Sequence, residues 1–258
     1  MILAVVFNSM LLQIKKMMSL REILEHRRAV RKYDPNKPLD DERVKECIRL
    51  ATLAPTSSNM QLWECYHVTD PEILRQLTRA CLSQQSARTA QQMVVFVTRQ
   101  DHWREHARAV LNANIEEINQ NSPENRKPHR IRLQKQYYDK LMPFSYKRCF
   151  GLLGLLRKIL VQVISLSRPV PRQVTEGNMR TVVHKSCALA VQTFMLAMSE
   201  QGYDTCPLEG FDSYLVKKAL HLPYNTGINM VITCGIRMPG GVRGDRYRLP
   251  FDEFYHKV

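Results

Sequence analysis

A long apolar helix in the second half of the chain most constrains what this sequence can fold into. Residues from about Asn178 to Gln201 place apolar side chains at helical spacing, and Gly202 stands where the helix would end. The apolar stripe comprises Val182, Val183, Cys187, Leu189, Ala190, Phe194, Met195 and Met198. Because this stripe is broad, the pattern predicts a helix that packs against other elements of a core.

Shorter apolar segments alternate with further helices along the rest of the chain. The run from Val94 to Val97 is short and β-branched, which is typical of a buried strand. The pattern predicts helices over about 19–28, 40–53, 71–82 and 213–220, strands over 64–68, 93–98 and 228–235, and a loop over 204–212. These elements do not follow a strict βαβ rhythm. We therefore expect an α+β fold with helices flanking a central sheet.

The length of 258 residues and the 44% hydrophobic content suit one core domain with an elaboration. We expect residues 19–258 to form this domain. We interpret residues 1–18 as an N-terminal extension that includes an upstream start, because a plausible helix start follows at Ser19. The seven cysteines show no CxxC or CxH spacing, so we expect neither a metal site nor a disulfide framework, and a reducing cytoplasm suits them.

The formal net charge of +14 is concentrated in one part of the chain. Residues 126–172 hold twelve Lys or Arg against one acid, Asp139, which gives this segment a charge of +11. The remainder is nearly balanced. This distribution argues against a nucleic-acid-binding protein, for which basic residues would mark the whole domain, and we expect no nucleic-acid partner.

Three segments carry residues that suit a flat, phosphate-bearing ligand. The basic cluster at 27–32 offers arginine forks that match phosphate oxygens in pairs, although a solvated helix end would look similar. The hydroxyls and amides of 55–63 suit a ribityl chain or the polar edge of a flavin ring, although a polar turn is an equal alternative. In the segment 207–212, Gly210 would let backbone amides approach such a ring, although a plain loop would contain the same residues.

Taken together, these segments resemble the FMN-dependent nitroreductase family. The shared order is Arg-Arg-x-x-Arg at 27–31, Pro-Thr-Ser-Ser-Asn-x-Gln-x-Trp at 55–63, Glu-Gly-Phe-Asp at 209–212, and Arg-Tyr-Arg-Leu-Pro at 246–250. The resemblance spans roughly residues 19–100 and 178–255. It implies a three-layer fold with a mostly antiparallel sheet, an intertwined homodimer, and FMN sites at the dimer interface.

The resemblance also implies the residues that bind FMN. Those implied to hold its phosphate are Arg27, Arg28, Arg31, Arg246 and Arg248. Those implied to reach the flavin from the partner subunit are Thr56, Ser57, Asn59 and Gln61. The backbone implied to lie against the ring near N5 is that of Pro207, Leu208, Glu209 and Gly210. Two positions depart from the family pattern, because Ala29 replaces a serine and Leu62 replaces a proline.

The implied reaction is ping-pong hydride transfer from NAD(P)H through FMN to a nitroaromatic, a quinone or a similar small acceptor. We expect no catalytic side chain, because the cofactor itself carries the electrons. His184 and Lys185 are alternatives as proton donors, but surface or packing roles are the simpler interpretation. For Cys206 we likewise favour packing over redox chemistry.

The basic insertion at about 101–175 leaves three uses open: a lid over the active site, an extension of the dimer contact, or an anchor to a membrane or an acidic partner through residues 149–166. We favour the lid. Two alternative functions also stay open. One is reductive dehalogenation or flavin modification on the same scaffold. The other is a basic amphipathic binding protein with a vestigial flavin site.

Overall fold

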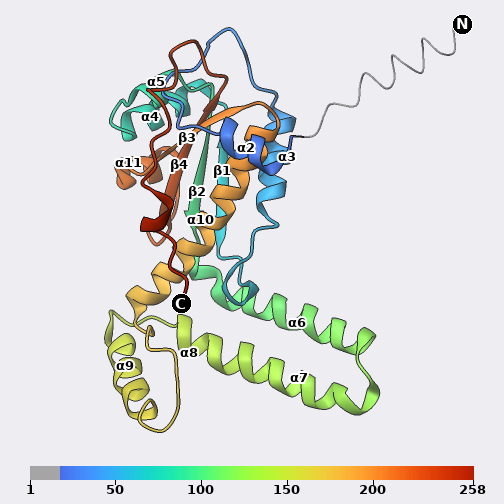
Figure 1. The fold of residues 1–258 in the computed structure, drawn as a ribbon. Coiled ribbons are helices and arrows are strands. Elements are labelled where there is room, and N and C mark those ends of the chain that lie inside the picture. Colours follow the sequence, from blue (N-terminus) through green and yellow to red (C-terminus); the bar gives the residue numbers. More distant parts are fainter. Residues whose placement is uncertain (1–17) are drawn as a thin grey trace, which may run out of the picture.

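An antiparallel sheet forms the centre of the computed structural model, which describes residues 18–258 (Figure 1). Within these residues its strands are β1 (Trp63–Val68), β2 (Gln92–Thr98), β3 (Asp204–Leu208) and β4 (Gly227–Gly235). They lie in the order β1-β2-β4-β3, and every pairing is antiparallel. The middle strand β2 is buried along its whole length, as the run of β-branched residues predicts. The predicted extension falls largely on residues 1–17, which lie outside the described residues.

Helices cover both faces of the sheet and complete three layers (Figure 1). On one face, α3 (Asp41–Ala51) and α10 (Glu176–Glu200) pack with Val94, Phe96 and Ile232 in one core cluster. On the other face, α4 (Pro71–Ala80) and α11 (Ser213–Ala219) pack with Val95 and Val97. Alternate residues of β2 thus enter opposite cores, as the pleat requires. The predicted α+β fold with a flanked antiparallel sheet is confirmed.

The helix boundaries follow from capping residues that the sequence provides. Asp40, Asp70 and Asp212 accept hydrogen bonds from the first backbone amides of α3, α4 and α11. Thr175 forms a capping box with Asn178 at the start of α10. Gly202, with a φ of 77°, lies just past the end of α10, where a left-handed residue closes a helix.

The prediction of a loop over residues 204–212 is wrong for its first half, because residues 204–208 form strand β3. Pro207 hides the strand in the sequence, since it lacks an amide hydrogen for a ladder. Among the strands of the described sheet β3 pairs with β4 alone, and its other side forms only an isolated bridge between Thr205 and Ala29, so Pro207 is tolerated there. Burial of Cys206 and Leu208 in the second core stabilises the strand.

The helix α10 is long and apolar enough to cross a membrane by length and composition, and within residues 18–258 no other helix is. Its apolar side chains instead face the core: Cys187, Ala190, Phe194 and Met198 are fully buried against the sheet and α3. These contacts make α10 the central helix of the core, as the broad stripe predicts.

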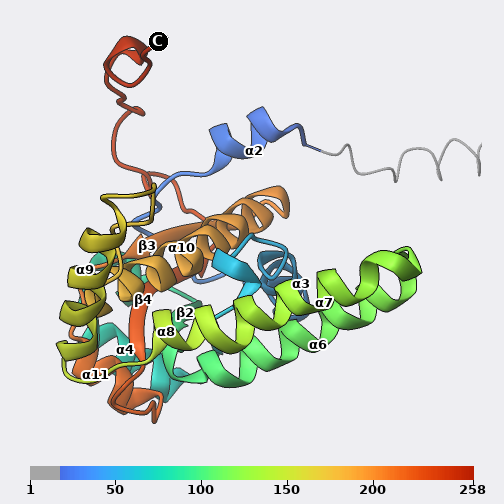
Figure 2. The same ribbon diagram turned by 90° about the horizontal axis from the view of Figure 1, so that it is seen from below.

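The insertion is helical and projects from the sheet. Its elements are η2 (Gln100–His102), α6 (Trp103–Asn121), η3 (Glu124–Arg126), α7 (Lys127–Gln136), the π-helical η4 (Tyr137–Leu141), α8 (Met142–Tyr146) and α9 (Leu152–Ile164). Helices α6 and α7 run side by side away from the core, while α9 lies apart from them near the start of α10 (Figures 1 and 2). Several large apolar side chains of 150–166 are exposed, including Leu155, Ile159 and Val163.

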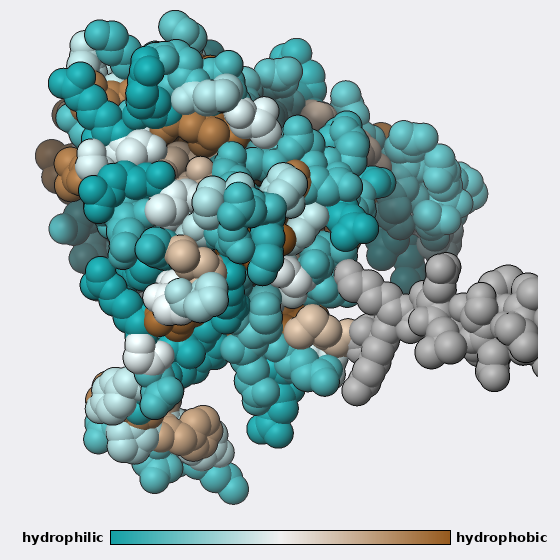
Figure 3. All heavy atoms as spheres, turned by 90° about the horizontal axis from the view of Figure 1, so that it is seen from above, coloured by the Kyte–Doolittle hydropathy of each residue, from teal (hydrophilic) through white to brown (hydrophobic). Residues whose placement is uncertain are grey.

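Two terminal segments extend from the core and do not cover the sheet of their own chain. They are α2 (Leu20–His26) and the C-terminal tail that ends in η5 (Phe251–Glu253), which lie away from the body in Figure 2. The end of the tail is the projecting lobe at the lower left of Figure 3, where apolar and polar residues mix. Phe251 is 69% exposed and Phe254 is 65% exposed. Such exposed aromatic groups on an arm are typical of a surface that another chain covers.

Candidate functional site

The basic cluster at 27–31 lies beside the edge strand β3 and not on a helix. Helix α2 ends at His26, and the chain from Arg27 onwards is extended. The amide of Val30 donates to the carbonyl of Thr205 at 3.2 Å, and Ala29 forms a parallel bridge with Thr205. Only Arg27, the C-cap of α2, therefore lies at a helix end, and Arg28 and Arg31 lie beyond it on non-helical chain, whereas the sequence pattern extended the helix to residue 28. The bridge to β3 is a tertiary contact that helical periodicity cannot reveal.

An ion pair between Arg237 and the buried carboxylate of Asp204 fixes the chain at the start of this cluster. The carboxylate of Asp204, whose side chain is only 2% exposed, accepts from the backbone amide of Arg237 at 2.7 Å and from its Nε at 2.8 Å. Nη2 of Arg237 also donates to the carbonyl of His26 at 2.7 Å. Because a buried pair with several hydrogen bonds holds one geometry, the start of the arginine segment is rigidly placed.

Six arginines line one cavity of about 250 Å³, which we call the arginine pocket. Its lining residues are Arg27, Arg28, Ala29, Arg31, Val242, Arg243, Asp245, Arg246, Tyr247 and Arg248. The structure therefore brings together all five arginines that the sequence predicts and adds Arg243. Burial lowers the pKa of the Arg27 guanidinium, and the like charges of Arg246, Arg248 and Arg28 lower it further. A dianionic phosphate would relieve this repulsion, so the pocket fits the phosphate of FMN.

The arginines differ in how far their donors are already used. Nη1 of Arg246 donates to the backbone carbonyl of Leu24 at 2.9 Å, and its Nη2 donates to the backbone carbonyls of Glu25 at 2.9 Å and Arg27 at 2.7 Å. Arg28 donates to the carbonyl of Gly244 at 2.9 Å. Arg246 therefore holds the tail against the end of α2, a role that its sequence motif does not disclose.

We expect Arg246→Ala to lower the free energy of unfolding by about 1–3 kcal/mol, because it leaves carbonyls at the end of α2 without their donor. Arg248→Ala is the matched control, since Arg248 is exposed and donates only to its neighbour Tyr247 at 2.7 Å. Urea unfolding of both variants checks this prediction. Equal stabilities would contradict the bracing role of Arg246.

The polar segment 56–61 forms a self-bonded turn beside α10. Oγ1 of Thr56 accepts from the amide of Gln61 at 3.1 Å, and Nε2 of Gln61 donates to Oδ1 of Asn59 at 3.1 Å. The amide of Ser57 donates to Ser186 on α10 at 3.1 Å. Ser58, Asn59 and Gln61 all have φ near +50°, a region that non-glycine residues rarely adopt. Such clustered strain is typical of a functional loop.

None of the residues 56–61 lines the arginine pocket of the same chain. Both segments contain residues suited to FMN, yet the structure keeps them apart within one chain. Their separation is what two half-sites on different subunits would show. It supports the expectation that the turn acts on the partner's flavin.

The third predicted segment lies at the end of β3, on the same sheet edge as the arginines. Pro207 and Leu208 belong to the strand, and Glu209 and Gly210 follow it in an exposed position. The carbonyl of Gly210 accepts from Nε2 of Gln84 at 2.8 Å. Gln84 precedes helix α5 (Gln85–Thr89) and is a site residue that sequence reasoning missed, although Gln84-Gln85-Ser86 offered a polar signal at a helix start.

One buried hydroxyl along this edge has no hydrogen-bond partner within residues 18–258. It is Oγ1 of Thr205, beside the arginine segment. A buried polar atom without a hydrogen bond is costly unless a ligand or water completes it. Together with the crowded arginines, this hydroxyl shows that the residues present fit a polar, phosphate-bearing group along β3.

The side chains considered as proton donors do not gather at this edge. His184 on α10 faces β4, where Nδ2 of Asn229 lies 3.1 Å from its Nδ1, and burial and the nearby Arg180 lower its pKa. Lys185 is exposed. Cys206 is fully buried, and burial raises the pKa of its thiol, as a packing role requires.

The lowered histidine pKa values predict that stability falls in weak acid. Burial, followed by the charge of Arg237, lowers the pKa of His26, and burial likewise lowers that of His184. The unfolded chain then gains protons near pH 6.5 while the folded chain does not, so stability is lost as pH falls below about 6.5. We expect a smaller loss between pH 7.5 and 5.5 in a His26→Gln, His184→Gln variant. An unchanged pH dependence by urea unfolding would contradict this assignment.

Comparison with known proteins agrees with this geometry. The sequence model of the nitroreductase family matches residues 24–236, so the chain belongs to the nitroreductase family. MhqN of Bacillus subtilis, named as an NAD(P)H nitroreductase, is 23% identical over 90% of this chain and 95% of its own. The family match confirms the predicted family, and the names of the relatives agree with the predicted class of oxidoreductase.

Solved structures share the fold. A Staphylococcus epidermidis structure described as an NAD(P)H:FMN oxidoreductase superimposes with a TM-score of 0.70 at 21% identity, covering 95% of this chain and 99% of the other. A nitroreductase of Exiguobacterium sibiricum in complex with FMN gives a TM-score of 0.65 at 19% identity, covering 93% of this chain and 98% of the other. Both likenesses cover nearly the whole chain.

Proposed function

We propose that this protein passes electrons from NAD(P)H through FMN to a nitroaromatic, a quinone or a similar small acceptor by ping-pong transfer. The observation that carries this proposal is the arginine pocket, where six guanidinium groups surround about 250 Å³ beside one edge strand. Bound FMN supplies the hydride chemistry. Support for the flavin also comes from the FMN complex of the Exiguobacterium neighbour.

The protein's own residues bind and orient the cofactor. Arg27 and Arg31 hold the phosphate with donors that make no other hydrogen bond among residues 18–258, while Arg246 fixes the tail that closes the pocket. The backbone at Glu209 and Gly210 lies further along the same edge, held by Gln84. A backbone amide there would stabilise negative charge on the reduced ring without a catalytic acid or base.

We infer that the protein works as a homodimer in which residues 56–61 complete the partner's site. The exposed aromatic tail and the exposed Leu20 and Leu24 of α2 support this inference, because they offer apolar surface away from their own core. The seven cysteines are all free within the structure, which suits a reducing compartment such as the cytoplasm. No nucleic-acid contact is needed for any of these features.

The principal test is the flavin itself. The purified protein should be yellow, and stopped-flow measurements should show its reduction by NADH or NADPH and its reoxidation by a panel of acceptors. Steady-state initial rates at varied concentrations of donor and acceptor should give parallel lines in double-reciprocal plots. A colourless protein that FMN cannot reconstitute would refute the proposal. A flavoprotein that neither nicotinamide reduces would refute the electron donor but not the cofactor.

We propose that the insertion acts as a lid, with the dimer contact and the membrane anchor as the other outcomes of one test. Deleting residues 149–166 removes α9 together with its exposed leucines. If the insertion is a lid, its deletion should change the range of accepted substrates. If the insertion is a membrane anchor, the deletion should abolish sedimentation with anionic vesicles. If it is a dimer contact, the deleted protein should be monomeric in gel filtration. If none of the three measurements changes, all three interpretations fail.

A further inference from the structure

A second basic cavity lies at the opposite end of the sheet from the N-terminus of β3. It has a volume of about 380 Å³ and lies where Thr98 of β2 pairs with Gly227 of β4. Its lining residues are Thr98, Gln100, Arg148, Arg180, Ser213, Tyr214, Lys217, Tyr224, Asn225, Thr226, Gly227 and Ile228. None of them lines the arginine pocket, so the two cavities are separate.

Two buried polar side chains of this cavity have no partner. Gln100 is only 5% exposed, and neither its Nε2 nor its Oε1 makes a hydrogen bond within the described residues. Thr226 is 1% exposed, and its Oγ1 also lacks a partner. An amide whose donor and acceptor are both buried and unused is rare in a folded protein. These atoms indicate a polar ligand that the protein chain does not itself supply.

Three cations surround these unpaired groups. Arg148 and Arg180 make no hydrogen bond or ion pair with residues 18–258, and both are exposed to solvent on one side. Lys217 uses one donor, to the carbonyl of Tyr224 at 2.8 Å, and lies over that ring at 5.3 Å. Burial lowers the pKa of Arg148, Glu176 opposes this shift, and the like charge of Arg180 adds to it. The cavity thus concentrates positive charge.

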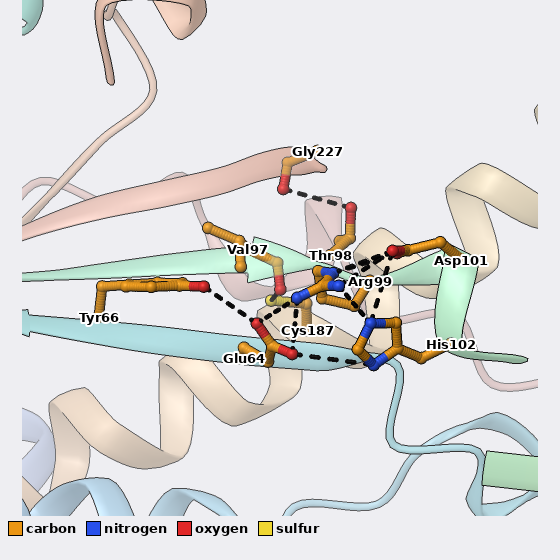
Figure 4. A network of polar contacts seen from close by, with 9 residues as sticks. All are labelled: Glu64, Tyr66, Val97, Thr98, Arg99, Asp101, His102, Cys187 and Gly227. Atoms are coloured by element: carbon orange, nitrogen blue, oxygen red, sulfur yellow. Dashed lines mark hydrogen bonds and ion pairs between the residues drawn. The ribbon is translucent and has the colours of Figure 1, made fainter. Parts of the chain in front are cut away.

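The two acids whose charge acts on Arg148, Asp101 and Glu176, already accept hydrogen bonds from other donors. Asp101 accepts from Nη2 of Arg99 at 3.0 Å, and Glu64 accepts from Nη1 of Arg99 at 2.8 Å, so one arginine occupies both carboxylates (Figure 4). Glu176 accepts from the backbone amides of Cys149 at 3.0 Å and Gly151 at 3.1 Å. Arg99 is therefore neutralised, whereas Arg148 and Arg180 face the cavity without a carboxylate of their own.

We propose that this cavity binds the phosphate group of a small organic molecule. The phosphate lies between Arg148, Arg180 and Lys217, since guanidinium forks match its oxygens in pairs. The Gln100 amide supplies one donor and one acceptor to the same ligand. The exposed rings of Tyr214 and Tyr224 at the rim suit a flat organic part of the molecule.

The test is calorimetric titration of the FMN-loaded protein with inorganic phosphate and with adenosine 2′,5′-bisphosphate. Loading with FMN occupies the arginine pocket, so the remaining binding reports the second cavity. We expect both probes to bind, the bisphosphate more tightly. Arg148→Ala with Arg180→Ala should weaken both by at least roughly tenfold, because each removes charge-assisted hydrogen bonds. If the protein proves to hold no FMN, the same titration uses the Arg27→Ala, Arg248→Ala background.

Matched controls separate this site from general basicity. Arg168→Ala with Lys185→Ala removes the same charge from exposed positions outside the cavity and should leave both affinities unchanged. Gln100→Leu should weaken binding without lowering the free energy of unfolding, because the buried amide has no partner to lose. Absence of binding by both probes, or an equal loss in the control pair, would overturn the proposal.

Discussion

Arg27→Ala combined with Arg248→Ala should weaken FMN binding by roughly a hundredfold to ten-thousandfold. Each arginine lost from a phosphate removes charge-assisted hydrogen bonds worth about 1.5–3 kcal/mol, and about 1.4 kcal/mol corresponds to a factor of ten. Arg27 is the more important of the two, because it is half-buried and makes no hydrogen bond through its side chain within the described part of the chain. The exposed Arg248 contributes at the lower end of the range.

Fluorescence titration of FMN into the apoprotein measures this effect. A double variant of matched charge, Arg43→Ala with Arg75→Ala, changes two exposed arginines on α3 and α4 and should bind FMN as the wild type does. Since Arg27 and Arg248 brace no buried carbonyl, the first variant should keep its unfolding midpoint. Unchanged FMN affinity at unchanged stability would show that the phosphate lies elsewhere.

The sequence predicts most of the fold because the strongest signals are local. The stripe of α10, the β-branched run of β2 and the aspartate caps each specify their own element, and tertiary contacts agree with them. Strand β3 was not predicted, because Pro207 and its polar neighbours do not fit the pattern of a strand. Its stability comes from pairing with β4, 20 or more residues further along the chain.

The candidate site was predictable where a residue type carries the chemistry. Arginine clusters and a hydroxyl-rich turn point to a phosphate and a polar ring edge wherever they occur. The bracing role of Arg246 and the contact of Gln84 with Gly210 depend on which backbone groups tertiary folding brings near, so composition could not reveal them. The unpaired amide of Gln100 is likewise visible only once burial is known.

Mixed dimers should distinguish a shared flavin site from one contained in a single chain. We consider one subunit with Arg27→Ala and Arg248→Ala, and a partner with Asn59→Gly. The glycine removes the side chain while keeping the positive φ of 51° that this position requires. If the turn 56–61 completes the partner's site, one site of the mixed dimer combines an intact arginine pocket with an intact turn, and the other carries both defects.

The mixed dimer should therefore bind one FMN tightly, whereas each parent homodimer binds none at the same concentration. Two affinity tags on the two subunits isolate the mixed species, and flavin absorbance per dimer gives the occupancy. If both halves of a site came from one chain, every site in the mixed dimer would carry a defect, and no tight binding would return. Recovery of half the wild-type occupancy thus requires that the turn of one subunit serve the arginine pocket of the other. This result would also explain why the structure separates these segments within a single chain.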